Sequence, residues 1–177
     1  AEAEPFGRAA LAAHRANLPA DHPDLATILE VYGSTLSELG RHDEALALLD
    51  DAVRIRRKVL SADHPRLATT LTLEGVALNS AGRPADAELR FRESLAIREK
   101  ALSPTHWHIA NTRSLLGSAL VGQRRFDEAE SLLLESAEAL AANPATPPVR
   151  QKAARERLVR LYEDWGRPAE AEKWRAP

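Results

Sequence analysis

The fold is decided by a segment that begins at His22 and reads HPDLATILEVYGSTLSELGRHDEA as far as Ala45. The segment returns 42 residues later, from His64 to Ala87, as HPRLATTLTLEGVALNSAGRPADA, and again over residues 106–129 as HWHIANTRSLLGSALVGQRRFDEA. A fixed period of about 20–50 residues is the signature of one supersecondary unit stacked on copies of itself. The sequence therefore predicts a repeat array, and such arrays normally bind other molecules.

The first half of each repeat predicts an amphipathic helix. Between Pro23 and Leu39 the apolar residues recur at spacings of three and four, as they do on one face of a helix. Pro23 suits the first turn, where its missing N–H would be unpaired anyway, and Asp21 or His22 can cap the exposed amides. Gly40 ends the helix.

The second half of the repeat predicts another helix, whose last turn carries Arg56, Arg57 and Lys58 near the negative end of the helix dipole. The same pattern extends over the whole chain. The predicted helices cover residues 2–18, 23–39, 43–60, 65–81, 84–101, 107–122, 126–141, 149–165 and 168–175.

Small residues recur where the two helices of a repeat face each other. Glycine stands in the middle of the first helix at Gly33, Gly75 and Gly117. Each such glycine costs about 1 kcal/mol relative to alanine, so its recurrence indicates that the second helix packs closely against the backbone. The facing helix offers Ala45, Ala87 and Ala129. The recurrence is therefore interpreted as steric.

Helix pairs with these marks resemble the tetratricopeptide repeat. The marks are Gly33, Gly40 and Ala45, then Gly75, Gly82 and Ala87, then Gly117, Arg124 and Ala129. The usual period is about 34 residues. The longer period here, the His-Pro openings and the stretch from Phe91 to Lys100 resemble the variant found in kinesin light chains and in many bacterial signalling proteins. The resemblance implies an all-α fold, a right-handed superhelical solenoid of antiparallel helix hairpins.

We expect one repeat array over residues 1–177. It comprises a half repeat with the second helix only (1–21), three full repeats (22–63, 64–105 and 106–147) and a degenerate C-terminal repeat (148–177). The proline-rich stretch 143–148 is the only real linker and bends the array without ending it. Because the chain contains no Met and residue 1 falls inside a repeat, we expect it to be a fragment of a longer protein.

Composition and charge narrow the class of function. The chain carries 24 basic and 26 acidic side chains, and its net charge of −2 argues against a nucleic-acid partner. It contains no apolar run of about 18 residues, so we expect no membrane insertion. The absence of cysteine excludes disulfides and thiolate metal sites. The N-terminus lacks the pattern of a signal peptide, and we expect a cytoplasmic location.

The resemblance implies that the first helices of the repeats line a concave groove where a partner binds. The candidate groove residues are Thr27, Glu30, Ser34, Ser37, Thr69, Thr72, Val76, Asn79, Asn111, Ser114, Ser118, Arg157 and Arg160. Glu30, Thr72 and Ser114 stand where a clamp for a C-terminal carboxylate needs Lys or Asn, so such a clamp is not expected. The Asn with which kinesin light chains hold a cargo peptide is likewise missing. An alternative is that the Ser and Thr side chains simply keep this surface hydrated.

The residues that could bind a metal or take part in catalysis are assigned structural roles. The periodic histidines open helices one repeat apart, which indicates capping or packing and no metal site. No Ser-His-Asp arrangement and no phosphate-binding loop is present, so we predict neither an enzyme nor a cofactor. Trp107 either replaces in packing the prolines at positions 23 and 65, or is an exposed anchor for a partner.

Three hypotheses of function follow. The first is a non-catalytic interaction scaffold for a peptide or partner domain on the concave face. The second is a regulatory or sensor domain of a larger bacterial signalling protein, because the ending from Arg155 to Gly166 resembles the terminus of arrays that follow serine/threonine kinase domains. The third is self-association through the N-terminal half repeat, whose Phe6, Leu11 and Leu18 form an apolar face without a covering helix.

Overall fold

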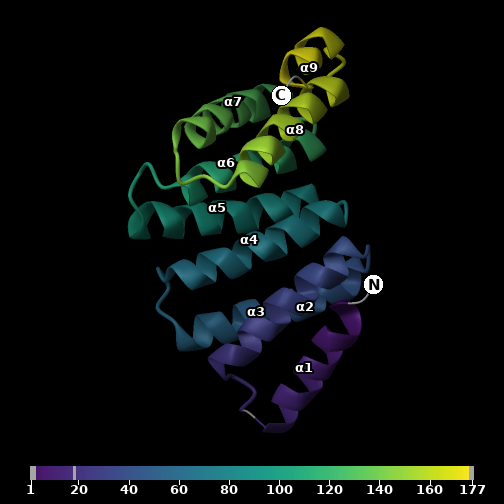
Figure 1. The fold of residues 1–177 in the computed structure, drawn as a ribbon, viewed down its shortest axis with the longest axis vertical. Helices are drawn as coiled ribbons and strands as arrows, with labels where there is room; N and C mark the ends of the chain where they lie inside the picture. The colour runs from purple at the N-terminus through teal and green to yellow at the C-terminus, as the bar shows by residue number, and fades with distance from the viewer. Residues whose placement is uncertain (1–2, 18, 176–177) are drawn as a thin grey trace. The chain divides into compact units, whose positions relative to one another are not determined.

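The computed structural model describes residues 3–17 and 19–175. Within these residues the chain forms nine α-helices and no strand. Figure 1 labels these helices along the ribbon. The helices are α1 (Ala3–Asn17), α2 (Pro23–Glu38), α3 (His42–Val59), α4 (Pro65–Ser80), α5 (Pro84–Ala101), α6 (Trp107–Gly122), α7 (Phe126–Ala142), α8 (Pro148–Asp164) and α9 (Pro168–Arg175). The predicted all-α class is confirmed.

Histidine caps begin the first helix of each full repeat. The Nδ1 atom of His22 accepts a hydrogen bond from the backbone N–H two residues later at 3.2 Å, and His64 and His106 do the same at 3.1 and 3.2 Å. Each bond satisfies an amide that the first helical turn leaves without a partner. Trp107, which follows the last of these caps, is partly buried against the core around α6 to α8. The structure thus agrees with capping by histidine and with a packing role for Trp107.

The turn between the two helices of a repeat needs a left-handed backbone residue. Gly40, Gly82 and Gly166 adopt it with φ of 77°, 73° and 76°. Glycine takes this conformation without the steric cost that a Cβ atom brings. Arg124 occupies the same place in the third repeat with φ of 60°, the only non-glycine residue with positive φ in the described part of the chain.

The mid-helix glycines are sites of close helix approach. A Cβ atom on Gly33 would lie 2.9 Å from Leu49 Cγ, one on Gly75 would lie 2.6 Å from the Phe91 ring, and one on Gly117 would lie 2.7 Å from Leu133 Cγ. The facing alanines Ala45, Ala87 and Ala129 are fully buried. The predicted steric role of these small residues is therefore confirmed. Gly7 of α1 makes the same kind of contact with Tyr32, at 2.5 Å, and was not predicted.

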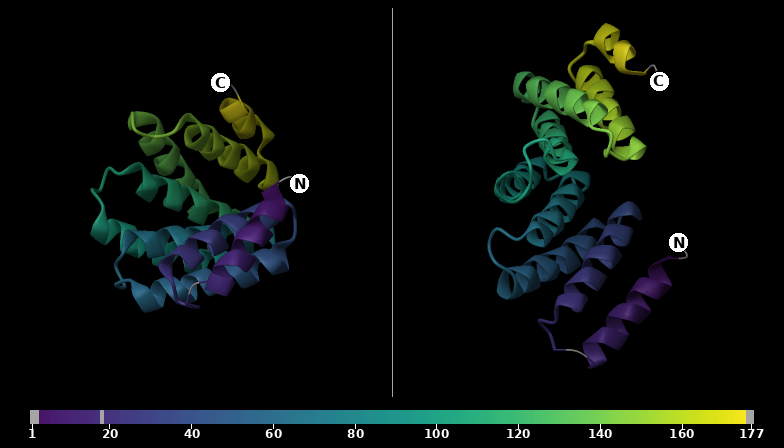
Figure 2. Two further views of the ribbon diagram at one scale, coloured as in Figure 1. Left: turned by 60° about the horizontal axis from the view of Figure 1, so that its bottom comes forward. Right: turned by 60° about the vertical axis from the view of Figure 1, so that its left-hand side comes forward.

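The chain divides into two compact units, Ala1–Ile97 and Arg98–Pro177, with the division inside α5. We call them the N-terminal and the C-terminal unit. In the N-terminal unit α1 lies along α2, and in the C-terminal unit α9 folds back on α8, as Figure 2 shows. The repeat boundaries and the continuity of one array over residues 1–177 stay predictions.

The first helix is partly covered. Leu11 is 7% exposed and belongs to the core shared with α2 and α3, whereas Phe6 is 77% exposed. Leu18, the third member of the predicted apolar face, lies outside the described residues. Among the helices of the described ranges, none combines the length and apolar character needed to cross a membrane.

Candidate functional site

The predicted groove residues lie on the first helix of each repeat. Those of the N-terminal unit belong to α2 and α4, and those of the C-terminal unit belong to α6 and α8. The two sets differ in the hydrogen-bond partners of their polar side chains.

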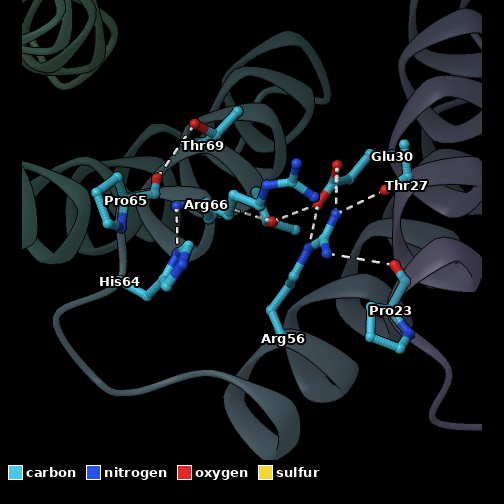
Figure 3. A network of polar contacts seen from close by, with 9 residues as sticks. Pro23, Thr27, Glu30, Arg56, His64, Pro65, Arg66 and Thr69 are labelled. Atoms are coloured by element: carbon cyan, nitrogen blue, oxygen red, sulfur yellow. Dashed lines mark hydrogen bonds and ion pairs between the residues drawn. The ribbon is translucent and has the colours of Figure 1, made fainter.

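In the N-terminal unit a buried arginine forms hydrogen bonds with the side chains of the groove candidates Thr27 and Glu30. Arg56 of α3 is 2% exposed, and its guanidinium donates to both carboxylate oxygens of Glu30, at 3.0 and 3.3 Å (Figure 3). It also donates to Thr27 Oγ1 at 2.9 Å and to the carbonyl oxygen of Pro23 at 3.3 Å. Thr70 of α4 donates its hydroxyl to Glu30 at 2.5 Å, so the network joins three helices. From the sequence we expected Arg56 only to lie near the negative end of the helix dipole. Its pairing with Glu30 was not predicted, because it depends on how α3 is rotated against α2.

The other groove candidates of this unit are likewise satisfied or partly buried. Thr69 donates to the carbonyl oxygen of Pro65 at 3.3 Å, as Figure 3 also shows. Thr72 is 7% exposed and shares hydrogen bonds of 2.8 Å with the Ala68 carbonyl and the Ser94 hydroxyl. The three remaining polar candidates, all partly buried, are Ser34, Ser37 and Asn79.

Two of the side chains that α2 and α4 leave exposed are large and apolar. Val31 is 64% exposed and Val76 is 37% exposed. Position 34 is the repeat equivalent of Val76, and it lies one helical turn after Val31. The two valines therefore occupy one face of the repeat's first helix.

In the C-terminal unit two groove candidates on α6 are buried, and one of them, Ser114, binds an arginine. Asn111 is 5% exposed and Ser114 is fully buried, whereas Ser118 is partly buried. Arg157 of α8 donates to Ser114 Oγ at 3.1 Å. The Oδ1 atom of Asn111 is buried and has no hydrogen-bond partner among the residues that the structure describes. Arg160 is exposed and lies 3.5 Å from the Asp164 carboxylate.

The buried arginine of this unit, Arg98, lacks an acidic partner. Arg98, in the last turn of α5, is 4% exposed and donates to the His108 carbonyl oxygen at 3.1 Å and to the Thr112 hydroxyl. Burial lowers the pKa of Arg98 to about 10, and burial followed by the charge of Arg150 lowers the pKa of Arg157 to about 10. Both guanidinium groups, of buried Arg98 and of partly buried Arg157, therefore remain charged at neutral pH.

The structure gives Arg98, Arg150 and Arg157 no ion pair with any carboxylate among the described residues. We call these three arginines the cationic cluster. The backbone carbonyl of His108 accepts a hydrogen bond from Arg98. Burial, then the charges of Arg98, His106 and Arg150, lower the pKa of the His108 ring to about 4. His108 is thus neutral at pH 7.

Sequence reasoning predicted Arg157 but not Arg98, Arg150 or His108. A signal for Arg98 was present, since it repeats Arg56 at the 42-residue spacing while Thr72 replaces Glu30. No three His, Asp or Glu residues of the described segments come together as metal ligands.

Comparison with known proteins places this geometry in a family. A family model described as tetratricopeptide repeat matches residues 1–58 and 24–100, and a second model with the same description matches residues 109–140. No curated protein sequence is significantly similar to the chain.

Solved structures with the same fold are distant in sequence. The chain is similar to the nearly identical tetratricopeptide-like repeats of a protein from Podosopora anserina described as a kinesin light chain, with a TM-score of 0.76, 23% identity, and coverage of 98% of this chain and 82% of that one. A single-substitution variant of that protein gives a TM-score of 0.78 at 22% identity with the same coverage. BtubC (BKLC) from P. vanneervenii gives a TM-score of 0.77 at 19% identity, with 98% of this chain and 69% of that one covered.

These likenesses confirm the predicted solenoid type of fold, and the connection to kinase arrays stays a prediction. The family models match well over half of the sequence, on the helix pairs described above. The chain belongs to the tetratricopeptide repeat family.

Proposed function

We propose that this chain is a non-catalytic interaction module that holds a peptide segment or a partner domain against the first helices of its repeats. Tetratricopeptide repeats generally mediate protein–protein interaction, and their scaffold is typically non-catalytic. In this proposal the module acts in the cytoplasm on a protein partner and uses neither a cofactor nor nucleic acid.

The observation that carries the proposal is the pair of exposed valines. Val31 and Val76 lie on one face of helices whose other apolar residues are mostly buried, and neither valine belongs to the core of the unit. Exposed apolar side chains on the same face of successive repeats provide contact area for a partner without weakening the stack. The satisfied hydroxyl groups around them favour a surface that is already rigid before a partner arrives.

The test is selection of binding peptides from a random peptide library on the immobilised chain. We expect the selected peptides to bind at least about tenfold more weakly to the double variant Val31→Glu, Val76→Glu, because two new charges interrupt the apolar contact. The matched control is Leu89→Glu on α5, at a residue as exposed as Val31, with an exposed fraction of 64%. Equal losses in variant and control, or no selected peptides at all, would contradict the proposal.

A further inference from the structure

We infer that the N-terminal unit has a second binding site, a pocket between α3 and α5 that receives a basic side chain of a protein partner on the carboxylate of Asp50. The exposed valines lie on the first helices of the repeats, whereas this pocket is lined mainly by the second helices. The inference therefore goes beyond the proposed function.

The pocket has a volume of about 360 Å³ and lies where α3, α4 and α5 meet. Its apolar wall includes Leu46 and Ala47 of α3 and Leu78 of α4. Charged side chains add to the lining, namely the acids Asp50, Glu74 and Asp86 and the arginines Arg83 and Arg90. A long basic side chain suits such a surface, because its methylene stem covers apolar atoms while its charged head reaches a carboxylate.

The lining holds one more carboxylate than guanidinium groups. The Nε and Nη2 atoms of Arg83 both contact Oδ2 of Asp86, each at 2.8 Å. Arg90 Nε lies 2.9 Å from Glu74 Oε2. Asp50 is exposed and forms no ion pair with any residue that the structure describes. Asp50 is therefore the carboxylate that remains for a cation from outside.

Buried Glu74 adds to the negative potential of the pocket. Its side chain is 6% exposed, and its Oε2 atom, although it lies beside Arg90, accepts no hydrogen bond from the described residues. Burial raises the pKa of this carboxyl group, the charge of Arg90 opposes the rise, and the charge of Asp50 adds to it. Because Oε2 is closed to solvent, Glu74 acts on a ligand through its charge, while Asp50 makes the contact.

Neither acid has a counterpart in the neighbouring repeats. At the 42-residue spacing, Asp50 corresponds to Arg8 and Arg92. Each of these arginines donates to a glutamate four residues earlier on its own helix. Glu74 corresponds to the buried Tyr32. The chain thus places its own cation at this position in the repeats on either side, and the pocket has an acid there instead.

The chain contains no cysteine, so a single introduced thiol reports on its own surroundings. Ala47→Cys places the thiol at an exposed residue of the pocket. The variant is equilibrated with cystamine, 2-hydroxyethyl disulfide and their thiols, so that its adducts carry either an ammonium or a hydroxyl group, and both adducts are quantified by intact-protein mass spectrometry. Ser131→Cys is the matched control, because Ser131 is exposed, holds the same position two repeats later and has Leu134 where the pocket has Asp50.

The ratio of ammonium to hydroxyl adduct should be at least about threefold higher in Ala47→Cys than in Ser131→Cys. Adding Asp50→Asn to Ala47→Cys should abolish most of this preference. Asp51→Asn removes an equal charge one turn from the thiol and should preserve most of it, because Asp51 already pairs with Arg54 at 2.8 Å. Equal ratios in the two cysteine variants, or equal effects of the two asparagine variants, would overturn the site.

The partner is tested by repeating the peptide selection on the variant Val31→Glu, Val76→Glu, which removes the valine contact. The selected peptides should contain arginine or lysine, and Asp50→Asn should weaken their binding at least about fivefold. Finding no binding peptides, or only peptides that tolerate Asp50→Asn, would overturn the basic partner. Such a result leaves the proposed function untouched, because peptides that depend on Val31 and Val76 are selected on the parent chain.

Discussion

Arg56 and Arg98 hold the same position in consecutive repeats, yet they have opposite electrostatic surroundings. Both are nearly inaccessible to solvent, with 2% and 4% of their surface exposed. Arg56 meets the Glu30 carboxylate through two hydrogen bonds, whereas Arg98 meets only a carbonyl oxygen and the Thr112 hydroxyl. The N-terminal unit neutralises its buried cation, and the C-terminal unit does not.

The difference comes from one position of the repeat. Thr72 stands 42 residues after Glu30, so the acid present in the first full repeat is absent from the second. The helix caps and the close helix crossings are retained in both repeats, which means that the fold tolerates this exchange. The repeats therefore share their scaffold while they differ in what their polar residues are available to bind.

The largest effect on the free energy of unfolding is expected when buried Arg56 loses its carboxylate partner Glu30. Glu30→Ala leaves Arg56 buried and unpaired, and removing one partner of a buried pair costs roughly 3–5 kcal/mol. The free energy of unfolding, measured by denaturant titration, should fall by this amount. The matched control is Glu44→Ala, which breaks a solvent-screened pair with Arg41 and should change the free energy of unfolding far less. Similar losses in both variants would mean that the network of Figure 3 does not join the three helices.

The second prediction replaces the two arginines themselves by methionine. Arg56→Met should destabilise the chain by roughly 3 kcal/mol, because it leaves the Glu30 carboxylate without its cation. Arg98→Met should stabilise it by about 1 kcal/mol, because it removes a buried charge that has no acidic partner and Thr112 keeps its bond to the His108 carbonyl. The checking measurement is the unfolding midpoint of each variant in urea. A loss at Arg98 as large as that at Arg56 would erase the contrast between the units.

A third prediction concerns the turn, where one repeat of the C-terminal unit differs from the other repeats. The turn residues of the N-terminal unit are Gly40 and Gly82, whereas Arg124 adopts the same left-handed backbone with a Cβ atom present. Arg124→Gly should therefore relieve about 1 kcal/mol of backbone strain in the C-terminal unit. The net stabilisation is smaller, because the variant also loses the contact between the Arg124 guanidinium and the Phe126 ring. Thermal unfolding followed by circular dichroism detects the shift. A lower midpoint than that of the parent chain would show that the ring contact outweighs the strain.

A fourth prediction concerns the pH dependence of stability. The pKa of His108 is lowered from 6.5 to about 4 in the folded chain, by burial and by neighbouring cations. The unfolded chain therefore binds this proton at higher pH than the folded one. The stability that the folded chain gains from keeping His108 neutral is fully present above about pH 6.5, and it is lost as the pH falls from there towards 4.

The free energy of unfolding between pH 7 and pH 5 should consequently fall less steeply in His108→Gln than in the parent chain. Arg150→Gln should also reduce the slope, since it removes one of the cations that lower this pKa. An unchanged slope in both variants would place His108 outside the influence of the cationic cluster.

Much of the fold is readable from the sequence because its determinants are local. The histidine caps act within three residues, and the helix stripes recur within one turn, so every predicted helix has bounds within about one residue of the observed ones in the described ranges. Gly33 and its equivalents indicate a close approach because a mid-helix glycine weakens its own helix and recurs only where packing requires it. The family resemblance rests on the same residues.

The site is less predictable because it depends on helix rotation. In the sequence, Arg56 is one of three consecutive basic residues at a helix end. The local sequence does not show that Arg56 alone points inward, where it pairs with Glu30, 26 positions earlier. Ser114 lies on the first helix of its repeat, as the period predicts, but its hydrogen bond to Arg157 of α8 could not be predicted from its own helix. The missing acid beside Arg98 becomes visible only when the repeat alignment and the burial are combined.

The glycine crossings also bear on how such a chain changes its length. Gly33 meets Leu49, Gly75 meets Phe91 and Gly117 meets Leu133, each pair separated by sixteen positions and contained in one hairpin. A duplication or deletion of one whole period would therefore move a hairpin together with the contact that closes it. Evolution can add or discard binding surface in such steps without redesigning a core, and the exchange of Glu30 for Thr72 illustrates how a copied hairpin then acquires a chemistry of its own.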